Sequence, residues 1–185
     1  MVKDILKQTD EKMHKAVEVV RQELIKIRTG KATTALLDGI KVDYYGTHTP
    51  LSQVANVSVS DVHTIALQPW DKSMIAPIEK AIQAANLGLN PVSDGIMIRV
   101  PIPPLNEERR KELVKLVKKF AEEGKIAIRN IRRDAIEHLK KSEKAEHFSE
   151  DERKRGETEV QKLTDKIIKD IDNLVVLKEK EIMEV

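Results

Sequence analysis

Residues 106–144 form an unbroken stretch without proline, in which apolar side chains recur every three or four positions. This spacing keeps one side of an α-helix against a partner. Asn106 is suited to the N-cap position, and such a helix is about 58 Å long at 1.5 Å per residue. A helix of this length predicts an elongated bundle or coiled coil. The expected buried positions are Leu113, Leu116 or Val117, Phe120, Gly124, Ala127, Ile131, Ala135 and Leu139.

Two further segments repeat the same spacing and predict helices. Residues 2–29 end with Arg28 in the last turn and Gly30 as a stop, and Ser149 with Glu152 forms a capping box for the last helix. The short link at 143–148 predicts antiparallel neighbours, so the three helices form a bundle. The expected stripes are Leu6, Thr9, Met13, Ala16, Val20, Leu24 and Ile27, then Val160, Leu163, Ile167, Ile171, Leu174 and Leu177.

The composition changes abruptly between the first and second helices. Residues 31–105 hold all seven prolines but only 11 of the 64 charged residues. We therefore expect residues 30–105 to be a compact domain inserted into a discontinuous bundle of residues 1–29 and 106–185. Alternating or apolar runs at 40–44, 54–59, 64–67 and 96–100, with Val92 before the last, predict five or six short strands, and 71–86 predicts one helix. The fold class is α+β.

Two chain crossings join the inserted domain to the bundle. One is Thr29-Gly30-Lys31, and the other is Pro103-Pro104-Leu105. Glycine allows backbone freedom on one connection, and proline restricts the other. The pair predicts a hinge at Thr29, Gly30, Pro103, Pro104 and Leu105, with a fixed elbow as the alternative.

The middle of the long helix contains a basic run, Gly124 to Arg133, without any acidic residue. Its cations recur at steps of three and four, which places them on one side of the helix. Arginines on a rigid helix suit the recognition of phosphates. The charge pattern alone leaves two interpretations open, a surface for RNA or another polyanion and an ordinary solvated helix face. The cations are Lys125, Arg129, Arg132, Arg133 and Lys140.

Catalytic and cofactor signals are poor. The chain has no cysteine, and its five histidines lack metal-ligand spacing. Asp61 and His63 could pair, but no nucleophile accompanies them. The rings of Tyr44, Tyr45 and Trp70 could stack on bases, but we expect them in the core of so small a domain. We expect no enzyme, no cofactor and no metal site.

The chain has no apolar run long enough to span a bilayer, and its N-terminus is charged too early for a secretory signal. We expect a cytoplasmic protein that binds no membrane. The net charge of +2 does not itself demand a nucleic-acid partner.

Short motifs along the whole chain carry a resemblance to a known family. They are Ile27–Ala32, Val42–Gly46, Thr49–Leu51, Pro69–Lys72, Ile78–Ile82, Asn86–Pro91, Arg99–Leu105, Glu107–Arg110, Ala127–Ala135, Ser149–Glu152 and Gln161–Asp165. In this order they resemble the bacterial ribosome recycling factor family. The resemblance implies an L-shaped molecule, with the three-helix bundle as one arm and a small α/β sandwich domain as the other.

The resemblance also implies a function. It is the disassembly of the post-termination ribosomal complex into subunits with elongation factor G and GTP, which frees ribosomes from mRNA for new initiation. The implied partners are the 23S rRNA of the large subunit and elongation factor G, with no DNA, and we expect a monomer. The implied rRNA contacts are Arg28, Arg110, Arg129, Arg132 and Arg133. We add Lys125 to them on the basis of the charge pattern.

Two other functions remain open from the residues alone. The bundle could be a spacer in an adaptor protein whose inserted domain binds peptides. The acid-free arginine run argues against this, because a spacer has no need of it. An enzyme in the inserted domain would need convergent polar groups, and the sequence shows none.

Overall fold

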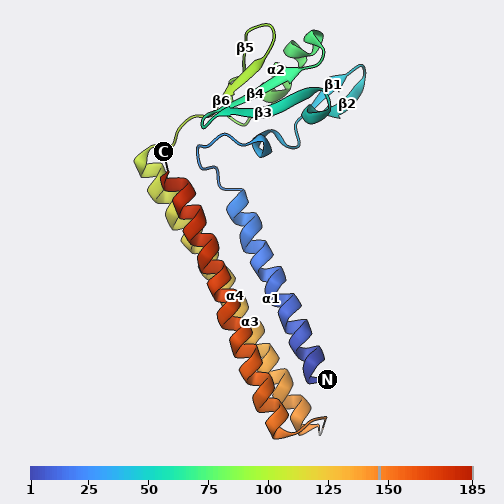
Figure 1. The fold of residues 1–185 in the computed structure, drawn as a ribbon, viewed down its shortest axis with the longest axis vertical. Coiled ribbons are helices and arrows are strands. Elements are labelled where there is room, and N and C mark those ends of the chain that lie inside the picture. Colours follow the sequence, from blue (N-terminus) through green and yellow to red (C-terminus); the bar gives the residue numbers. More distant parts are fainter. Residues whose placement is uncertain (146, 185) are drawn as a thin grey trace. The chain divides into compact units, whose positions relative to one another are not determined.

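A computed structural model describes residues 1–145 and 147–184 of the chain (Figure 1). The chain divides into two compact units. The first consists of Met1–Thr29 and the chain from Glu107 onward, and the second is Gly30–Asn106. Asn106, which we expected to begin the second part of the bundle, belongs to the inserted unit. No helix in the described part of the chain combines the length and apolarity needed to cross a bilayer.

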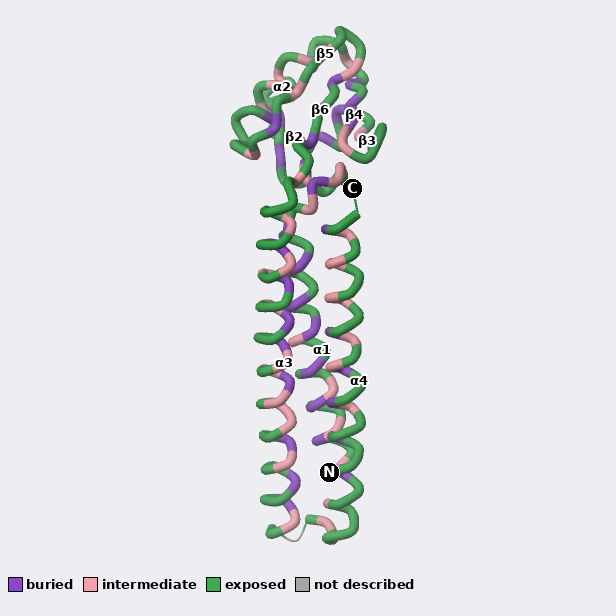
Figure 2. The backbone as a smooth tube through the Cα atoms, turned by 90° about the vertical axis from the view of Figure 1, so that its left-hand side faces the viewer, coloured by how far each residue is buried: buried purple, intermediate pink, exposed green. Residues whose placement is uncertain are grey.

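The first unit is a bundle of α1 (Val2–Ile25), α3 (Glu107–Lys144) and α4 (Glu150–Met183). Helices α3 and α4 are antiparallel, because Lys118 pairs with Glu179 near one end and Glu143 pairs with Arg153 near the other. Residue 146 in the predicted link lies outside the described residues. Figure 2 shows buried residues recurring along each helix, as expected for stripes that cover one another.

Helix α1 is shorter than predicted, because it ends at Ile25 and not at Thr29. Arg28 therefore lies beyond the last turn. Ile25, Ile27 and Thr29 are all β-branched, and such residues weaken a terminal helical turn. Ile27 is nevertheless buried after the helix has ended.

The buried stripes are close to the predicted ones but are rotated slightly around each helix. In α1, Ile5 and Val17 are buried where Leu6 and Ala16 were expected. In α3, Ala121 and Ile128 are buried, whereas Phe120, Ala127 and Ile131 are half-buried. The spacing fixes the period of a stripe, but which of two adjacent apolar residues lies at its centre depends on the neighbouring helices.

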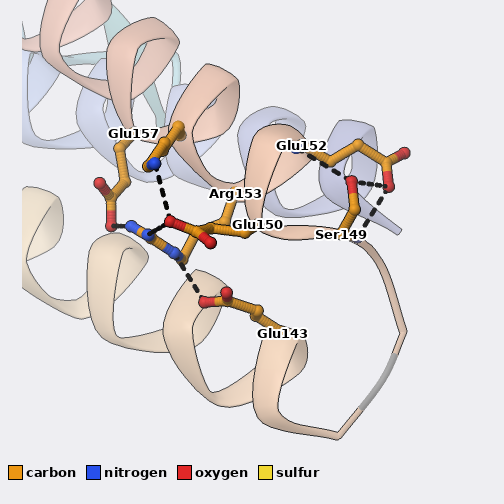
Figure 3. Close-up of polar contacts among 7 residues, drawn as sticks. Glu143, Ser149, Glu150, Glu152, Arg153 and Glu157 are labelled. Carbon is orange, nitrogen blue, oxygen red and sulfur yellow. Dashed lines mark hydrogen bonds and ion pairs between the residues drawn. The ribbon is translucent and has the colours of Figure 1, made fainter.

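Helix α4 begins as predicted, with a capping box in which Ser149 and Glu152 bond each other's backbone N–H. Next to it, Arg153 pairs with Glu143 of α3 and with Glu157, which fixes the start of α4 to the end of α3 (Figure 3). At the other end of α4, Leu177 is 64% exposed, so the prediction that it is buried was wrong.

The inserted unit contains a four-stranded antiparallel sheet in the order β3-β4-β6-β5 and a separate hairpin, β1-β2. The ranges are β1 (Lys41–Tyr44), β2 (Thr47–Pro50), β3 (Ala55–Asp61), β4 (Thr64–Pro69), α2 (Ile75–Ala84), β5 (Val92–Ser93) and β6 (Ile98–Pro101). Short 3-10 helices occupy Thr34–Leu37, Leu51–Gln53 and Lys72–Met74. The predicted last hairpin is confirmed by the pairing of β5 with β6. Strand β2 was missed, because Thr-His-Thr-Pro has no apolar alternation.

The core of the inserted unit is aliphatic and lies where α2 packs on the sheet. Ile65, Leu67 and Ile98 of the sheet and Ile78 and Ile82 of α2 are fully buried. The aromatic residues are not part of this core, contrary to our expectation. Tyr45 is 79% exposed and Trp70 is 70% exposed, since the first lies in a hairpin turn and the second follows the end of β4.

Candidate nucleic-acid interface

The basic residues of the long helix lie along one side of α3. At 100° per residue, Arg129, Arg133 and Lys140 fall within about 40° of one another, while Lys125 and Arg132 lie nearer to α4. We call these five residues the basic face. Arg133 and Lys140 are exposed, and Arg129 is 42% exposed.

Lys125 does not present a free charge. Its side chain is only 20% exposed, and its Nζ forms an ion pair with Asp172 of α4. Lys118, one heptad earlier, pairs with Glu179 in the same way. The absence of acids within the run therefore does not leave the charge of Lys125 uncompensated, because its partner lies on another helix.

Arg132 is held against α4 by a short chain of hydrogen bonds. Its Nη1 donates to Gln161 Oε1 at 3.1 Å, and Gln161 Nε2 donates to Asp165 Oδ1 at 2.9 Å. The Asp165 carboxylate thus engages the amide N–H, which leaves the amide oxygen for the guanidinium. Arg132 Nε is buried and has no hydrogen-bond partner among the described residues. The α4 contact therefore fixes the position of the guanidinium without saturating it.

Arg129 is paired within α3 itself. Its Nη1 donates to Glu122 Oε1 at 2.9 Å, two turns earlier in the helix. Arg133 has no ion pair or hydrogen bond to another side chain within the described part of the chain. The three arginines therefore differ: Arg129 is neutralised, Arg132 is positioned and Arg133 is unpaired.

The structure does not bring the other two predicted contacts into this group. Arg110 lies in the first turn of α3, about 28 Å along the helix axis from Arg129 at 1.5 Å per residue. It donates to the carbonyl oxygen of Met183 at 3.1 Å, so it holds the end of α4. Arg28 is exposed beyond the end of α1.

Within the inserted unit, both connections are attached to the turn between β3 and β4. Ala32 N donates to Val62 O at 2.7 Å, and Ile102 N donates to His63 O at 2.6 Å. The His63 ring, through Nδ1, bonds the Gly30 carbonyl at 2.9 Å. Three residues from the two connections are therefore bonded to one two-residue turn.

Gly30 also packs against the second connection. It is buried with φ +77°, a conformation that favours glycine, and a Cβ there would lie 3.1 Å from Leu105 Cγ. The predicted hinge residues Gly30, Pro103 and Leu105 are thus close together inside the inserted unit. Thr29 belongs to the bundle unit and Pro104 is exposed.

Sequence reasoning missed the residues that control the basic face. Glu122, Gln161 and Asp172 lie outside the run Gly124–Arg133, so a search for acids inside the run does not find them. In a pair of antiparallel helices, the residue numbers of two facing residues add up to a nearly constant value. The ion pairs Lys118–Glu179 and Lys125–Asp172 both follow this rule, since their residue numbers add up to the same value. That regularity is the signal that could have located Asp172, whereas Glu122 lies on α3 itself and Gln161 does not follow the same sum.

Comparison with known proteins places this architecture in a family. The family model for ribosome recycling factor matches residues 20–183. The chain belongs to the ribosome recycling factor family. Curated members include the ribosome-recycling factors of Symbiobacterium thermophilum, 57% identical over the whole of both chains, and of Chlorobium phaeobacteroides, 55% identical over 100% of this chain and 99% of the other.

Solved structures of ribosome recycling factors share the fold. A solution structure of a ribosome recycling factor aligns over 100% of this chain and 98% of the other, with a TM-score of 0.77 and 47% identity. A second match covers both chains completely, with a TM-score of 0.64 and 48% identity. It comes from models of the T. thermophilus ribosome recycling factor and the E. coli elongation factor G bound to the E. coli post-termination complex.

Proposed function

We propose that this protein disassembles the post-termination ribosomal complex into subunits in the cytoplasm, together with elongation factor G and GTP, and so frees ribosomes from mRNA for new initiation. Membership of the family supports this, as does the relative described on the post-termination complex with elongation factor G. We propose that the protein acts as a monomer and has no catalytic chemistry of its own. GTP hydrolysis would then belong to the elongation factor.

One observation supports the proposed binding to RNA. Arg129 and Arg133 are exposed on one side of α3, beside Arg132, which Gln161 holds in place. Arginine offers parallel N–H groups to phosphate, and a rigid helix keeps their spacing fixed. We propose that this face binds the 23S rRNA of the large subunit. Arg28 and Arg110 would contact the RNA at positions outside this face. Lys125 would contribute to binding only through neighbouring residues, because Asp172 neutralises its charge.

Binding alone cannot separate subunits, because a ligand shifts an equilibrium only by its differential affinity for the two states. We propose that the inserted unit is moved by elongation factor G while the bundle stays on the large subunit. The bending would take place in the two connections, outside the three residues that are bonded to the turn between β3 and β4, namely Gly30, Ala32 and Ile102.

Sedimentation of purified post-termination ribosomes tests the proposal. Ribosomes mixed with this protein, elongation factor G and GTP should shift from the 70S peak to separate subunit peaks. Omission of GTP, or of this protein, should leave the 70S peak intact. An unchanged 70S peak in the complete mixture would contradict the proposed function.

A further inference from the structure

The Arg129–Glu122 pair lies in the middle of the surface proposed to bind phosphate. At 100° per residue, Glu122 falls within about 20° of Arg129 and Arg133 around α3. Its carboxylate is 2.9 Å from Arg129 Nη1, although the two residues are seven positions apart. Both side chains are partly exposed, at 42% for arginine and 56% for glutamate, so an incoming group can reach the pair.

A carboxylate and a phosphate use the same N–H groups of a guanidinium. Arg129 therefore cannot give its full set of donors to an RNA phosphate while Glu122 holds Nη1. The carboxylate also repels a phosphate placed on this side of α3. Arg133 carries no comparable internal partner among the described residues, so the competition is specific to Arg129.

We propose that Glu122 is a built-in competitor for RNA phosphate that weakens binding of the basic face and speeds its release. This inference rests on the proposed function and concerns its regulation. A factor that has to leave the large subunit after each round gains from a moderate affinity. Glu122 lowers the affinity for RNA while Arg129 stays in place to orient the bound phosphate.

The size of the effect follows from the exposure of the pair. Exposed ion pairs form with an equilibrium constant of about 1 to 5. The apparent affinity falls in proportion to the fraction of molecules in which the arginine is free. Removal of the competitor should therefore raise the affinity by about two- to six-fold.

The test is Glu122→Gln, with binding measured on purified bacterial large ribosomal subunits at fixed salt. Glutamine keeps the length and the acceptor oxygen but removes the charge. The matched control is Glu123→Gln, which changes the net charge equally on the adjacent residue. Glu123 points about 100° further round the helix, away from the basic face, and is exposed. We expect a slower dissociation rate and tighter binding for Glu122→Gln and little change for Glu123→Gln.

A double-mutant cycle separates the pair from a general charge effect. In an Arg129→Ala background, Glu122→Gln should lose most of its effect, because the partner is already absent. The melting temperature should stay within a degree or two in all variants, since the pair is exposed. A structural role alone would move the melting temperature and leave the dissociation rate unchanged.

Three outcomes would overturn the inference. They are an equal gain from Glu122→Gln and Glu123→Gln, a gain that persists fully without Arg129, and no gain from Glu122→Gln while Arg133→Ala still weakens binding. The last result would leave the proposed function standing. If Arg133→Ala instead binds large subunits and splits ribosomes as the unchanged protein does, the result would count against the RNA-binding face itself.

Discussion

Arg133 and Arg132 test the basic face in different ways, because only Arg132 is tied to α4. Replacement of Arg133 by alanine removes an exposed charged donor and breaks no ion pair or side-chain hydrogen bond among the described residues. Hydrogen bonds to charged groups contribute about 1.5–3 kcal/mol, so affinity for large subunits should fall about ten- to one-hundredfold. The slope of log affinity against log salt concentration should become less steep by about 1, because one fewer counterion is released on binding. Binding titrations between low and high salt measure this slope.

Arg132→Ala should lower affinity to a similar degree with little loss of stability. It removes one hydrogen bond to Gln161 but also the buried, unpaired Nε, and the two effects oppose each other. The control is Arg155→Ala on an exposed part of α4. Lys178 is unsuitable as a control, because its side chain is 13% exposed and paired with Glu181. Similar loss of binding from Arg155→Ala would show that the effect is not local.

Asp94 should make the turn between β5 and β6 sensitive to acid. Its carboxylate accepts hydrogen bonds from the backbone N–H groups of Met97 and Ile96, which hold the pKa of Asp94 below its ordinary value. A folded-state pKa below the unfolded one gives stability that is present above about pH 4 and is lost as pH falls through the folded pKa. Asp94→Asn should therefore lessen the acid destabilisation of the inserted unit.

Carboxyl titration by NMR measures this directly, and amide signals of β5 and β6 report the stability of the turn. A titration midpoint for Asp94 at or above that of an unstructured peptide would contradict the prediction. Asp71 should behave in the same direction, because hydrogen bonds from Ser73 N, Ser73 Oγ and Tyr45 OH lower its pKa.

At the level of elements, Gly124 allows α1 and α3 to approach closely. A Cβ at this position would overlap Val20 Cγ2 of α1. Gly124→Ala would gain up to about 1 kcal/mol in helix propensity, but overpacking against a β-branched side chain costs about 1–3 kcal/mol. We expect a net fall in the melting temperature. Combination with Val20→Ala should recover part of the loss caused by Gly124→Ala, and an additive double variant would refute the contact.

His63 should determine how firmly the first connection is attached to the sheet. In His63→Ala, the Gly30 carbonyl loses its partner, so amide exchange at Ala32 should accelerate. His63→Asn places an amide nitrogen at the position of Nδ1 and should restore protection. Equal protection in the alanine variant would mean that the Ala32–Val62 backbone bond is sufficient on its own.

Local signals predicted most of the elements. The Ser149 capping box and the period of the long helices depend on residues within one or two turns, and both were found from the sequence. The exposure of Leu177 depends on what the rest of the chain places beside it. The exposure of Tyr45 and Trp70 was missed for a related reason, because composition does not show that both lie in turns outside the aliphatic core.

The candidate site was predictable only in part. The positions of Arg129, Arg132 and Arg133 on one helix follow from spacing alone. Their different states do not, because Glu122 is seven residues from Arg129 and Gln161 is on another helix. A charged run shows which side chains share a face, whereas their free charge depends on partners that only the folded bundle brings near.

At the scale of the whole molecule, the two connections should act as one joint. The chain has no cysteine, so Gln83→Cys in α2 and Lys169→Cys in α4 provide exposed and unique sites for two dyes. Because Gly30, Ala32 and Ile102 are held at the turn between β3 and β4, we expect bending elsewhere in the two connections and a broad distribution of energy transfer between the dyes in the free protein. Addition of large subunits and elongation factor G should narrow the distribution of energy-transfer efficiencies. A single narrow distribution under both conditions would favour a fixed elbow.

The discontinuous bundle also sets the order in which a newly made chain can fold. About 80 residues separate the end of α1 from the start of α3, which corresponds to roughly 4–16 s of synthesis. The inserted unit can close during this interval, whereas α1 waits with its apolar stripe uncovered. A chain stalled before α4 would thus carry a finished inserted domain and an unprotected helix, a state that cellular proteases can distinguish from the completed factor.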